Sequence, residues 1–260
     1  QNKGDNMELH LKGKVALVTG GSTGIGAGIS EYLAAEGVDI AVNYIVDKPQ
    51  VDEFVDYLNA KYKVNCTGVY GDVSKPADDD AMVEQVLNTY GKIDILVNNA
   101  GIWPTEDMKD MPDENWIRVI NINLNGPYLM SKRVVNSMIE RKIGGTIINI
   151  SSKSAFQVNT GGHGHYTTAK AGVNMMTRSL AREVSSYGIR VVGIAPGMVR
   201  TPLNEDKWNK DGLMEDYVTR IPVGRFAEPI EIGYLAAFLA SDCARNITGT
   251  VIDSTGGMLI

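Results

Sequence analysis

The stretch KVALVTGGSTGIG at residues 14–26 decides the fold of this chain. It begins with a short apolar run of the kind that forms a buried strand, and a helical pattern follows as far as Glu36. The glycines between them allow a tight turn and let phosphate oxygens approach the backbone, while the helix points free N–H groups at the same place. The spacing is G-x3-G-x-G rather than the commoner G-x-G-x-x-G. In this setting it predicts a dinucleotide cradle made of Gly20, Ser22, Thr23, Gly24, Ile25 and Gly26.

Short runs rich in Val, Ile and Leu alternate with longer helical patterns along the chain. The expected strands cover residues 14–19, 38–44, 66–70, 93–98, 146–150, 190–195 and 250–253. The expected helices cover residues 25–36, 51–61, 78–90, 113–141, 166–186 and 229–240. Continuous apolar strands that alternate with helices predict a parallel sheet with right-handed crossovers. We therefore expect an α/β, doubly wound Rossmann-type fold with a seven-stranded parallel sheet flanked by helices.

Residues 8–260 are expected to form a single domain, because no linker rich in Pro, Gly or Ser divides them. Residues 1–7 are expected to be an N-terminal extension, either native or left from cloning. Residues 199–225 break the rhythm of strand and helix. We expect them to form a substrate lid, because binding loops follow the carboxyl ends of parallel strands. The alternative is a surface helical excursion without a role.

Composition argues against several classes of protein. The chain is 43% hydrophobic and 22% charged, which is typical of a folded domain. A net charge of −6 with scattered Lys and Arg argues against a nucleic-acid partner. The sequence contains no run of 18 apolar residues, so it predicts no membrane-spanning helix. Two cysteines and three histidines are too few for a disulfide framework or a metal site. We therefore expect a cytoplasmic protein with a small-molecule substrate and no metal.

The segment Tyr166-Thr-Thr-Ala-Lys170 places a phenol and an amine on one helix face, four residues apart. A free phenol has a pKa of about 10, and a nearby ammonium would lower that pKa. Such a tyrosine can exchange the proton of an alcohol while a hydride moves at the adjacent carbon. Ser152 ends an expected strand and is the preferred hydrogen-bond donor to the substrate oxygen, with Ser151 and Ser154 as alternatives.

The choice between NAD and NADP depends on the tip of the second expected strand. Tyr44 and Ile45 occupy this tip, where an acidic residue would bind the ribose hydroxyls of NAD. The absence of a carboxylate there favours NADP, and Lys48 is near enough in sequence to meet a 2′-phosphate. Asp47 could still serve NAD. The cofactor is therefore NADP or NAD, with NADP preferred.

Together these motifs resemble those of the short-chain dehydrogenase/reductase family over about residues 8–260. The matching stretches are TGGSTGIG at 19–26, GDV at 71–73, NNAG at 98–101, NLNG at 123–126, ISS at 150–152, YTTAK at 166–170, APG at 195–197 and TGG at 255–257. The chain looks most like the compact members, which include oxoacyl-carrier-protein reductases, glucose dehydrogenases and sugar or polyol dehydrogenases. The resemblance implies an NAD(P)-dependent oxidoreductase that moves a hydride between the cofactor and a secondary alcohol or ketone, usually as a homotetramer.

The resemblance also implies roles for individual residues. The catalytic set would be Asn123, Ser152, Tyr166 and Lys170. In that set the tyrosine is the acid/base, the lysine lowers its pKa and binds the nicotinamide ribose, the serine steadies the carbonyl, and the asparagine holds a water. Asp72 and Val73 would frame the adenine, Asn99 the adenosine-side ribose region, and Pro196, Gly197 and Thr201 the nicotinamide amide. Tyr44, Ala100, Gly101, Val199, Tyr166 and Lys170 complete the expected cofactor site.

Substrate contacts are expected from Ser152, Ser154, Trp103, His163 and Tyr166. Polar residues in the loop before Tyr166 favour a sugar or polyol; the alternatives are a 3-oxoacyl-carrier-protein reductase and a non-catalytic dinucleotide-binding regulator. The chain departs from the family pattern in three ways. The spacing from Ser152 to Tyr166 is one residue longer than expected, Gly193 stands where asparagine is common, and Thr23 and Ile45 replace residues that are often basic.

Overall fold

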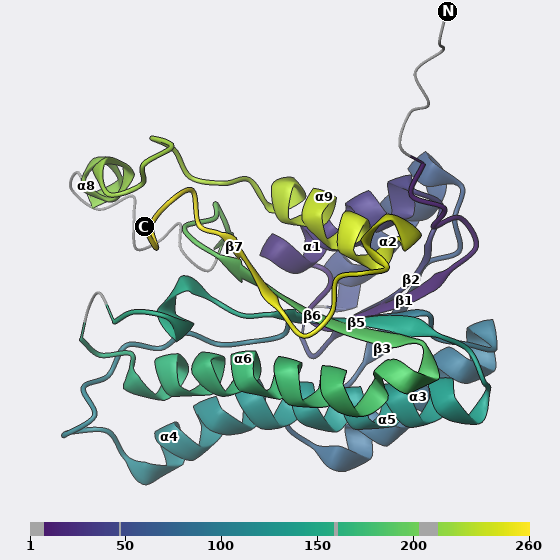
Figure 1. Ribbon diagram of the computed structural model, residues 1–260, viewed down its shortest axis with the longest axis horizontal. Helices are drawn as coiled ribbons and strands as arrows, with labels where there is room; N and C mark the ends of the chain where they lie inside the picture. Colours follow the sequence, from purple (N-terminus) through teal and green to yellow (C-terminus); the bar gives the residue numbers. More distant parts are fainter. Residues whose placement is uncertain (1–7, 47, 159–160, 203–212) are drawn as a thin grey trace, which may run out of the picture.

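A seven-stranded parallel sheet forms the centre of the protein (Figure 1). The computed structural model describes residues 8–46, 48–158, 161–202 and 213–260. The strands are β1 (Val15–Val18), β2 (Asp39–Tyr44), β3 (Thr67–Tyr70), β4 (Ile95–Asn98), β5 (Gly145–Ile150), β6 (Ile189–Pro196) and β7 (Val251–Ser254). Their order is β3-β2-β1-β4-β5-β6-β7. Strands β2 and β3 are added on one side of β1, and β4 to β7 are added on its other side. This reversal of strand order between β1 and β4 confirms the doubly wound fold and marks the place where such folds bind ligands.

Helices cover both faces of the sheet (Figure 1). One face carries α1 (Gly24–Ala35), α2 (Lys48–Tyr62) and α9 (Pro229–Ala240). The other carries α3 (Pro76–Tyr90), α4 (Asp113–Ile120), α5 (Gly126–Glu140) and α6 (Gly164–Val184). Neighbouring residues of β1 supply the two cores in turn, with Ala16 and Val18 in one and Val15 and Leu17 in the other. Burial on both faces explains why the strands are continuously apolar.

No helix in the described part of the chain combines the length and the apolar character that a membrane crossing needs.

Helices α1 and α9 approach so closely that a Cβ atom on Gly28 would lie 2.3 Å from the carbonyl carbon of Pro229. Only glycine fits at such a contact. The close packing holds α1, whose N-terminus follows the glycine turn, firmly against its neighbour.

The helix expected over residues 113–141 is interrupted, which corrects the prediction. A π-helical turn at Asn121–Asn125 separates α4 from α5. Such turns insert a residue into the helical ladder and often lie at functional sites. Helix α6 begins at Gly164, two residues before the expected start.

The predicted lid at 199–225 falls partly on residues 203–212, and the predicted extension falls on residues 1–7; both stretches lie outside the described residues. In the described part of the lid, α8 (Leu213–Thr219) is followed by Ile221, which is buried in a small cluster with Met198 and Phe226 from just outside the two ends of the lid.

Candidate active site

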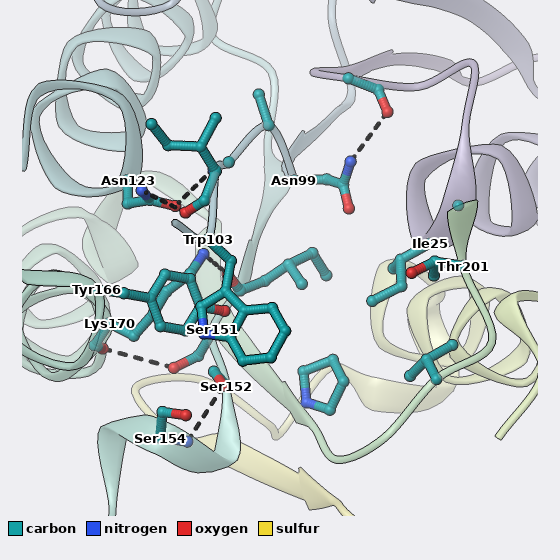
Figure 2. Close-up of a pocket in the computed structure, with 18 of the residues that line it drawn as sticks. Ile25, Asn99, Trp103, Asn123, Ser151, Ser152, Ser154, Tyr166, Lys170 and Thr201 are labelled. Carbon is teal, nitrogen blue, oxygen red and sulfur yellow. Dashed lines mark hydrogen bonds between the residues drawn. The ribbon is translucent and has the colours of Figure 1, made fainter. Parts of the chain in front are cut away.

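The carboxyl ends of β1, β4, β5 and β6 open into one cavity of about 290 Å³ (Figure 2). The sequence-predicted residues that line it are Gly20, Thr23, Gly24, Ile25, Asn99, Ala100, Gly101, Trp103, Asn123, Ser152, Ser154, Tyr166, Lys170, Pro196, Gly197, Val199 and Thr201. In Figure 2 the group around Tyr166, Lys170 and Ser152 lies on the opposite side of the cavity from Ile25 and Thr201. Residues from distant parts of the chain thus meet in a single pocket.

Six predicted residues are absent from the lining of this cavity: Ser22, Gly26, Tyr44, Asp72, Val73 and His163. Ser151, named as an alternative to Ser152, also lines it, and five others line it without having been predicted: Ile102, Ile150, Lys153, Met198 and Pro202. Most of these lie next to a predicted residue in the chain, so the motifs located the segments. They did not resolve which side chain of each segment faces the cavity.

The glycine turn leaves its backbone open to a ligand, and side chains at these positions would block the approach of that ligand. Gly20 and Gly24 have φ angles of +58° and +50°, in the left-handed region that favours glycine. A Cβ atom on Gly26 would lie 2.0 Å from the carbonyl oxygen of Gly20. Thr23 precedes α1 without a side-chain capping bond, so the first amides of the helix stay open to a ligand. These features fit the pyrophosphate of a dinucleotide.

Asn43 ties the glycine turn to the sheet. Its side-chain oxygen accepts a hydrogen bond from the Gly20 amide at 3.1 Å. Its side-chain nitrogen donates to the carbonyl oxygens of Gly71 at 2.9 Å and Val69 at 3.3 Å. Sequence reasoning missed this residue, although an asparagine inside the apolar run at 38–44 was a usable signal, because buried amides need partners.

A second clamp joins the glycine turn to the segment after β4. The Thr19 hydroxyl accepts hydrogen bonds from the amides of Asn99 at 2.9 Å and Ala100 at 3.0 Å. The Asn99 side-chain nitrogen donates back to the carbonyls of Thr19 and Gly20, at 2.9 and 3.0 Å. Asn99 therefore holds the turn in place as well as lining the cavity.

Tyr166, Ser152 and Lys170 form the group that the sequence predicted. The Lys170 ammonium donates to the Ile150 carbonyl at 2.7 Å and lies 5.7 Å from the centre of the Tyr166 ring. Burial lowers the pKa of Lys170 to about 8. The Tyr166 phenol behaves differently from the prediction. Burial raises its pKa, and the hydrogen bond with Ser152 acts in the lowering direction without outweighing burial.

This reversal has a physical reason. The sequence predicted that the Lys170 charge would lower the pKa of the phenol. In the structure the ammonium is itself buried and donates to a backbone carbonyl beside the ring. Desolvation of the phenol therefore dominates, and the deprotonated form is disfavoured by the protein alone.

The three candidate serines have different surroundings. Ser151 donates to the Asn174 side chain on α6 at 2.5 Å, so its hydroxyl already has a structural partner. Ser152 accepts a hydrogen bond from the Ser154 amide at 3.1 Å and bonds to the Tyr166 phenol. Ser152 is thus the hydroxyl best placed to act together with Tyr166.

Asn123 lies in the π-helical turn and is fully buried. Its side-chain nitrogen donates to the Ile102 carbonyl at 3.0 Å, and its oxygen accepts from the Ile102 amide at 3.2 Å. A Cβ atom on Gly101 would come within 2.6 Å of that oxygen. The asparagine therefore sets the course of the loop that leads to Trp103.

Trp103 forms an aromatic wall near the phenol. Its ring stacks on His163 with centroids 4.6 Å apart, and its centroid lies 6.4 Å from that of Tyr166. His163 also pairs through Nδ1 with the Pro104 carbonyl at 2.9 Å. His163 therefore packs against Trp103 and is not among the residues that line the cavity.

A chain of buried polar side chains fastens α6 to the sheet. Asn98 donates to the Asn149 side chain at 2.8 Å, and Asn149 donates to the Thr177 hydroxyl at 2.9 Å. Thr177 in turn donates to the Val173 carbonyl at 2.8 Å within α6. The motif NNAG gave no hint that its first asparagine acts in this way.

The expected adenine and ribose residues lie beyond the cavity. Asp72 accepts from the amide and the hydroxyl of Ser74, and Tyr44 meets Tyr70 edge to face with centroids 5.7 Å apart. Lys48 is paired with Asp52 at the start of α2. Asp47, the alternative for NAD, lies outside the described residues.

Gly193 has a structural explanation for its departure from the family pattern. A Cβ atom at this position would lie 2.8 Å from a methyl group of Val251 on the neighbouring strand.

The described residues contain no group of three or more His, Cys, Asp or Glu side chains that could hold a metal ion.

Comparison with known proteins identifies relatives along nearly the whole chain. Residues 20–259 match a family model described as enoyl-(acyl carrier protein) reductase. The chain is 38% identical over 245 residues to the 3-oxoacyl-[acyl-carrier-protein] reductase FabG of Staphylococcus aureus, covering 94% of this chain and 98% of that protein. It is 37% identical to 3beta-hydroxysteroid dehydrogenase 1 of Eggerthella lenta, with 96% and 95% covered.

Two further comparisons extend this result. The chain is 36% identical to glucose 1-dehydrogenase 2 of Bacillus subtilis, with 98% of each chain covered. The crystal structure of a short-chain type dehydrogenase/reductase from Mycobacterium marinum superposes with a TM-score of 0.91 at 33% identity, covering 96% of this chain and 97% of that one. The relatives share a fold and differ in the compounds that their names specify.

Replacing Asn43 should weaken dinucleotide binding. Asn43→Ala leaves the Gly20 amide and the Gly71 carbonyl without their partner, so we expect a loss of about 1–3 kcal/mol in the free energy of unfolding. The dissociation constant for the reduced cofactor, measured by fluorescence titration, should rise several-fold because the glycine turn is less well held. Asn59→Ala is the control, since Asn59 makes a similar pair of bonds to Cys66 away from the cavity. Equal affinities in the two variants would contradict the role of Asn43.

Burial of Lys170 predicts a specific dependence of stability on pH. Its folded-state pKa of about 8 lies below the ordinary 10.5, so the unfolded chain binds the proton more tightly. Stability should therefore rise with pH between these values. From pH 8 to 9.5, the free energy of unfolding of the native protein relative to Lys170→Met should increase by about 1–2 kcal/mol in urea titrations. A constant difference would show that this lysine does not titrate as its burial requires.

Proposed function

The chain belongs to the short-chain dehydrogenase/reductase family, and from that membership we propose that Asn123, Ser152, Tyr166 and Lys170 are its catalytic set. It is an NAD(P)-dependent oxidoreductase that acts on CH–OH and ketone groups. One observation carries the proposal: the glycine turn, the phenol, the serine hydroxyl and the amine share one cavity. The first would hold a dinucleotide and the others would act on a substrate oxygen beside it.

Tyr166 is the proposed acid and base. In the reduction of a ketone its hydroxyl donates a proton to the carbonyl oxygen, and in the oxidation of an alcohol its phenolate accepts that proton. Ser152 donates a hydrogen bond to the same oxygen and stabilises the negative charge that develops on it. A bound nicotinamide supplies the hydride in reduction and accepts it in oxidation.

Lys170 is proposed to act on the charge of the phenol. With a pKa of about 8 its amine is mainly protonated at neutral pH, and its charge near the ring offsets part of the desolvation cost of the phenolate without outweighing it. Asn123 keeps the loop after β4 in position through Ile102. The proposed cofactor contacts, from pyrophosphate to nicotinamide, are Gly20, Ser22, Thr23, Gly24, Ile25, Gly26, Asn99, Ala100, Gly101, Tyr166, Lys170, Pro196, Gly197, Val199 and Thr201, with Tyr44, Asp72 and Val73 on the adenosine side.

The proposed substrate is a small hydroxylated molecule such as a sugar or polyol. Ser152, Ser154 and the flat face of Trp103 lie around the same cavity, a combination that suits a compound with hydroxyl groups on a carbon frame. Similarity to a glucose 1-dehydrogenase supports this choice. The alternative is the reduction of 3-oxoacyl-carrier-protein substrates, which similarity to FabG and the family model support. A non-catalytic regulator is disfavoured because Tyr166 and Lys170 are both present.

Four further features of the whole protein remain predictions. The working unit is residues 8–260 as one domain, with a lid over about 199–225. The assembly is a homotetramer, as expected from the family resemblance. The location is the cytoplasm. The partners are small molecules.

Removal of the Tyr166 hydroxyl should abolish turnover while leaving cofactor binding nearly unchanged. Tyr166→Phe should lower kcat about 100- to 10,000-fold, because general acid–base catalysis contributes that much. Rates are read from the absorbance of reduced cofactor with glucose, sorbitol and an acetoacetyl thioester, which also separates the two substrate classes. Tyr187→Phe is the control, since Tyr187 is 55% exposed and lies beside β6 at its opposite end from the cavity. Substantial activity in Tyr166→Phe would exclude the proposed mechanism.

NADP is the proposed preferred cofactor. The described residues at the end of β2 are Tyr44, Ile45 and Val46, and none is a carboxylate that would repel a 2′-phosphate. Lys48 follows closely, and its present partner Asp52 is an exposed carboxylate that a phosphate could replace.

Affinity measurements test this preference. The native protein should bind NADPH several-fold more tightly than NADH, and Lys48→Ala should lose most of that difference because it removes the cation that follows the end of β2. NADH binding should be unchanged in this variant. Lys63→Ala, an exposed lysine at the far end of α2, is the matched control. Tighter binding of NADH by the native protein would overturn the preference and direct attention to Asp47.

A further inference from the structure

Lys153 lies next to the proposed reacting centre and has no assigned task. It follows Ser152 directly and opens the short 3-10 turn at Lys153–Ala155. It lines the same cavity as Ser152, Ser154 and Tyr166, and its side chain is partly buried. A lysine that loses water at the edge of a cavity needs an acceptor, because an unpaired ammonium is costly to bury.

The protein supplies no such acceptor within the described residues. Only burial and the positive charge of Arg220 act on the pKa of Lys153, and both lower it. No hydrogen bond and no carboxylate of the described chain contributes. Other lysines of the protein differ in this respect: Lys170 donates to a carbonyl and Lys92 pairs with Asp94.

The positive charge of Arg220 acts on Lys153, although Arg220 does not itself line the cavity. It follows α8, in the described part of the predicted lid, and it is held by an ion pair with Asp216 one helical turn earlier. The carboxylate of Asp216 is thereby engaged with the arginine. In a chain with a net charge of −6, the described residues that line the cavity include Lys153 and Lys170 and no carboxylate.

We propose that Lys153 binds an anionic group of the substrate, so that the enzyme acts on a hydroxy or keto compound carrying a carboxylate or a phosphate. The inference rests on the proposed function, because it places the anion relative to the oxygen held by Ser152 and Tyr166. Since Ser152 and Lys153 line the same cavity, one small molecule bound there can contact both. The anion provides the acceptor that the described residues do not give this partly buried ammonium, and its binding offsets the desolvation of the lysine.

The inference narrows the substrate class. A sugar acid or a sugar phosphate keeps the hydroxyl groups that suit Ser152 and Ser154 and adds the charge that suits Lys153. The two sources of charge share the same chemistry, an oxygen anion on a short frame. A neutral sugar leaves the lysine without a partner and is expected to bind less well.

Matched pairs of ketones test the role of Lys153. One pair is acetoacetate and methyl acetoacetate, and the other is dihydroxyacetone phosphate and dihydroxyacetone; each is assayed with the full chain and NADPH. Binding of the same four compounds to the complex with NADP⁺ is measured by calorimetry. The native protein should prefer a charged member over its neutral partner, and the preferred pair distinguishes carboxylate from phosphate.

The variants are Lys153→Met, Lys153→Arg and the control Lys142→Met, which changes an exposed lysine at the amino end of the sheet. Lys153→Met should lose about 10- to 100-fold in kcat/KM and affinity for the charged member, as expected for a hydrogen bond to a charged group. Its values for the neutral member should fall by a much smaller factor than those for the charged member. Lys153→Arg should keep most of the preference, and Lys142→Met should keep all of it.

The outcomes separate this inference from the function that it rests on. Equal losses for charged and neutral compounds in Lys153→Met, or no preference for either charged member in binding or turnover by the native protein, would overturn the anion site. The proposed function would still stand if the neutral ketones were reduced and Tyr166→Phe abolished that reduction. Loss of NADPH binding in Lys153→Met would assign the lysine to the cofactor and also overturn the inference.

Discussion

The positions of Tyr166 and Lys170, the proposed acid/base and its neighbour, depend on how helix α6 is held against the sheet. Three sets of buried hydrogen bonds hold it: Asn149 to Thr177, Ser151 to Asn174, and the Lys170 ammonium to the Ile150 carbonyl. A buried polar group that loses its partner costs about 1–3 kcal/mol, so a helix shifted along its axis would break several bonds together. The network therefore selects one position of α6. In that position the phenol at its first turn stands beside Ser152.

The cofactor side is organised by a different device. The sheet order reverses between β1 and β4, so the loops after these strands leave a crevice between them. Asn43 and Asn99 fasten the glycine turn to the strands on either side of β1. The turn needs these fastenings because glycine gives it freedom that would otherwise have to be lost on binding. The polar clamps thus make a flexible sequence into a preformed cradle.

Electrostatics joins the two sides of the cavity. The open N-terminus of α1, the buried Lys170 and the partly buried Lys153 all present positive charge or partial charge to one space. Such a field suits a dinucleotide and, on the substrate side, an anion. It also explains how an acidic chain can bind negatively charged molecules. Trp103 and Lys153 line the cavity beside Ser152 and Tyr166, so the two side chains help to define its shape and charge on the proposed substrate side.

Sequence by itself determined the features that depend on neighbours along the chain. Apolar runs and helical periods predicted the parallel sheet, the glycine spacing predicted the cradle, and the four-residue spacing of Tyr166 and Lys170 placed both on one helix face. Tertiary structure alone decided which serine faces the phenol, that Asn43 and Asn98 are clamps, that a π-helical turn interrupts residues 113–141, and that the pKa of Tyr166 is raised. These depend on contacts between residues far apart in sequence and on removal of water from side chains. Local spacing carries no information about either one.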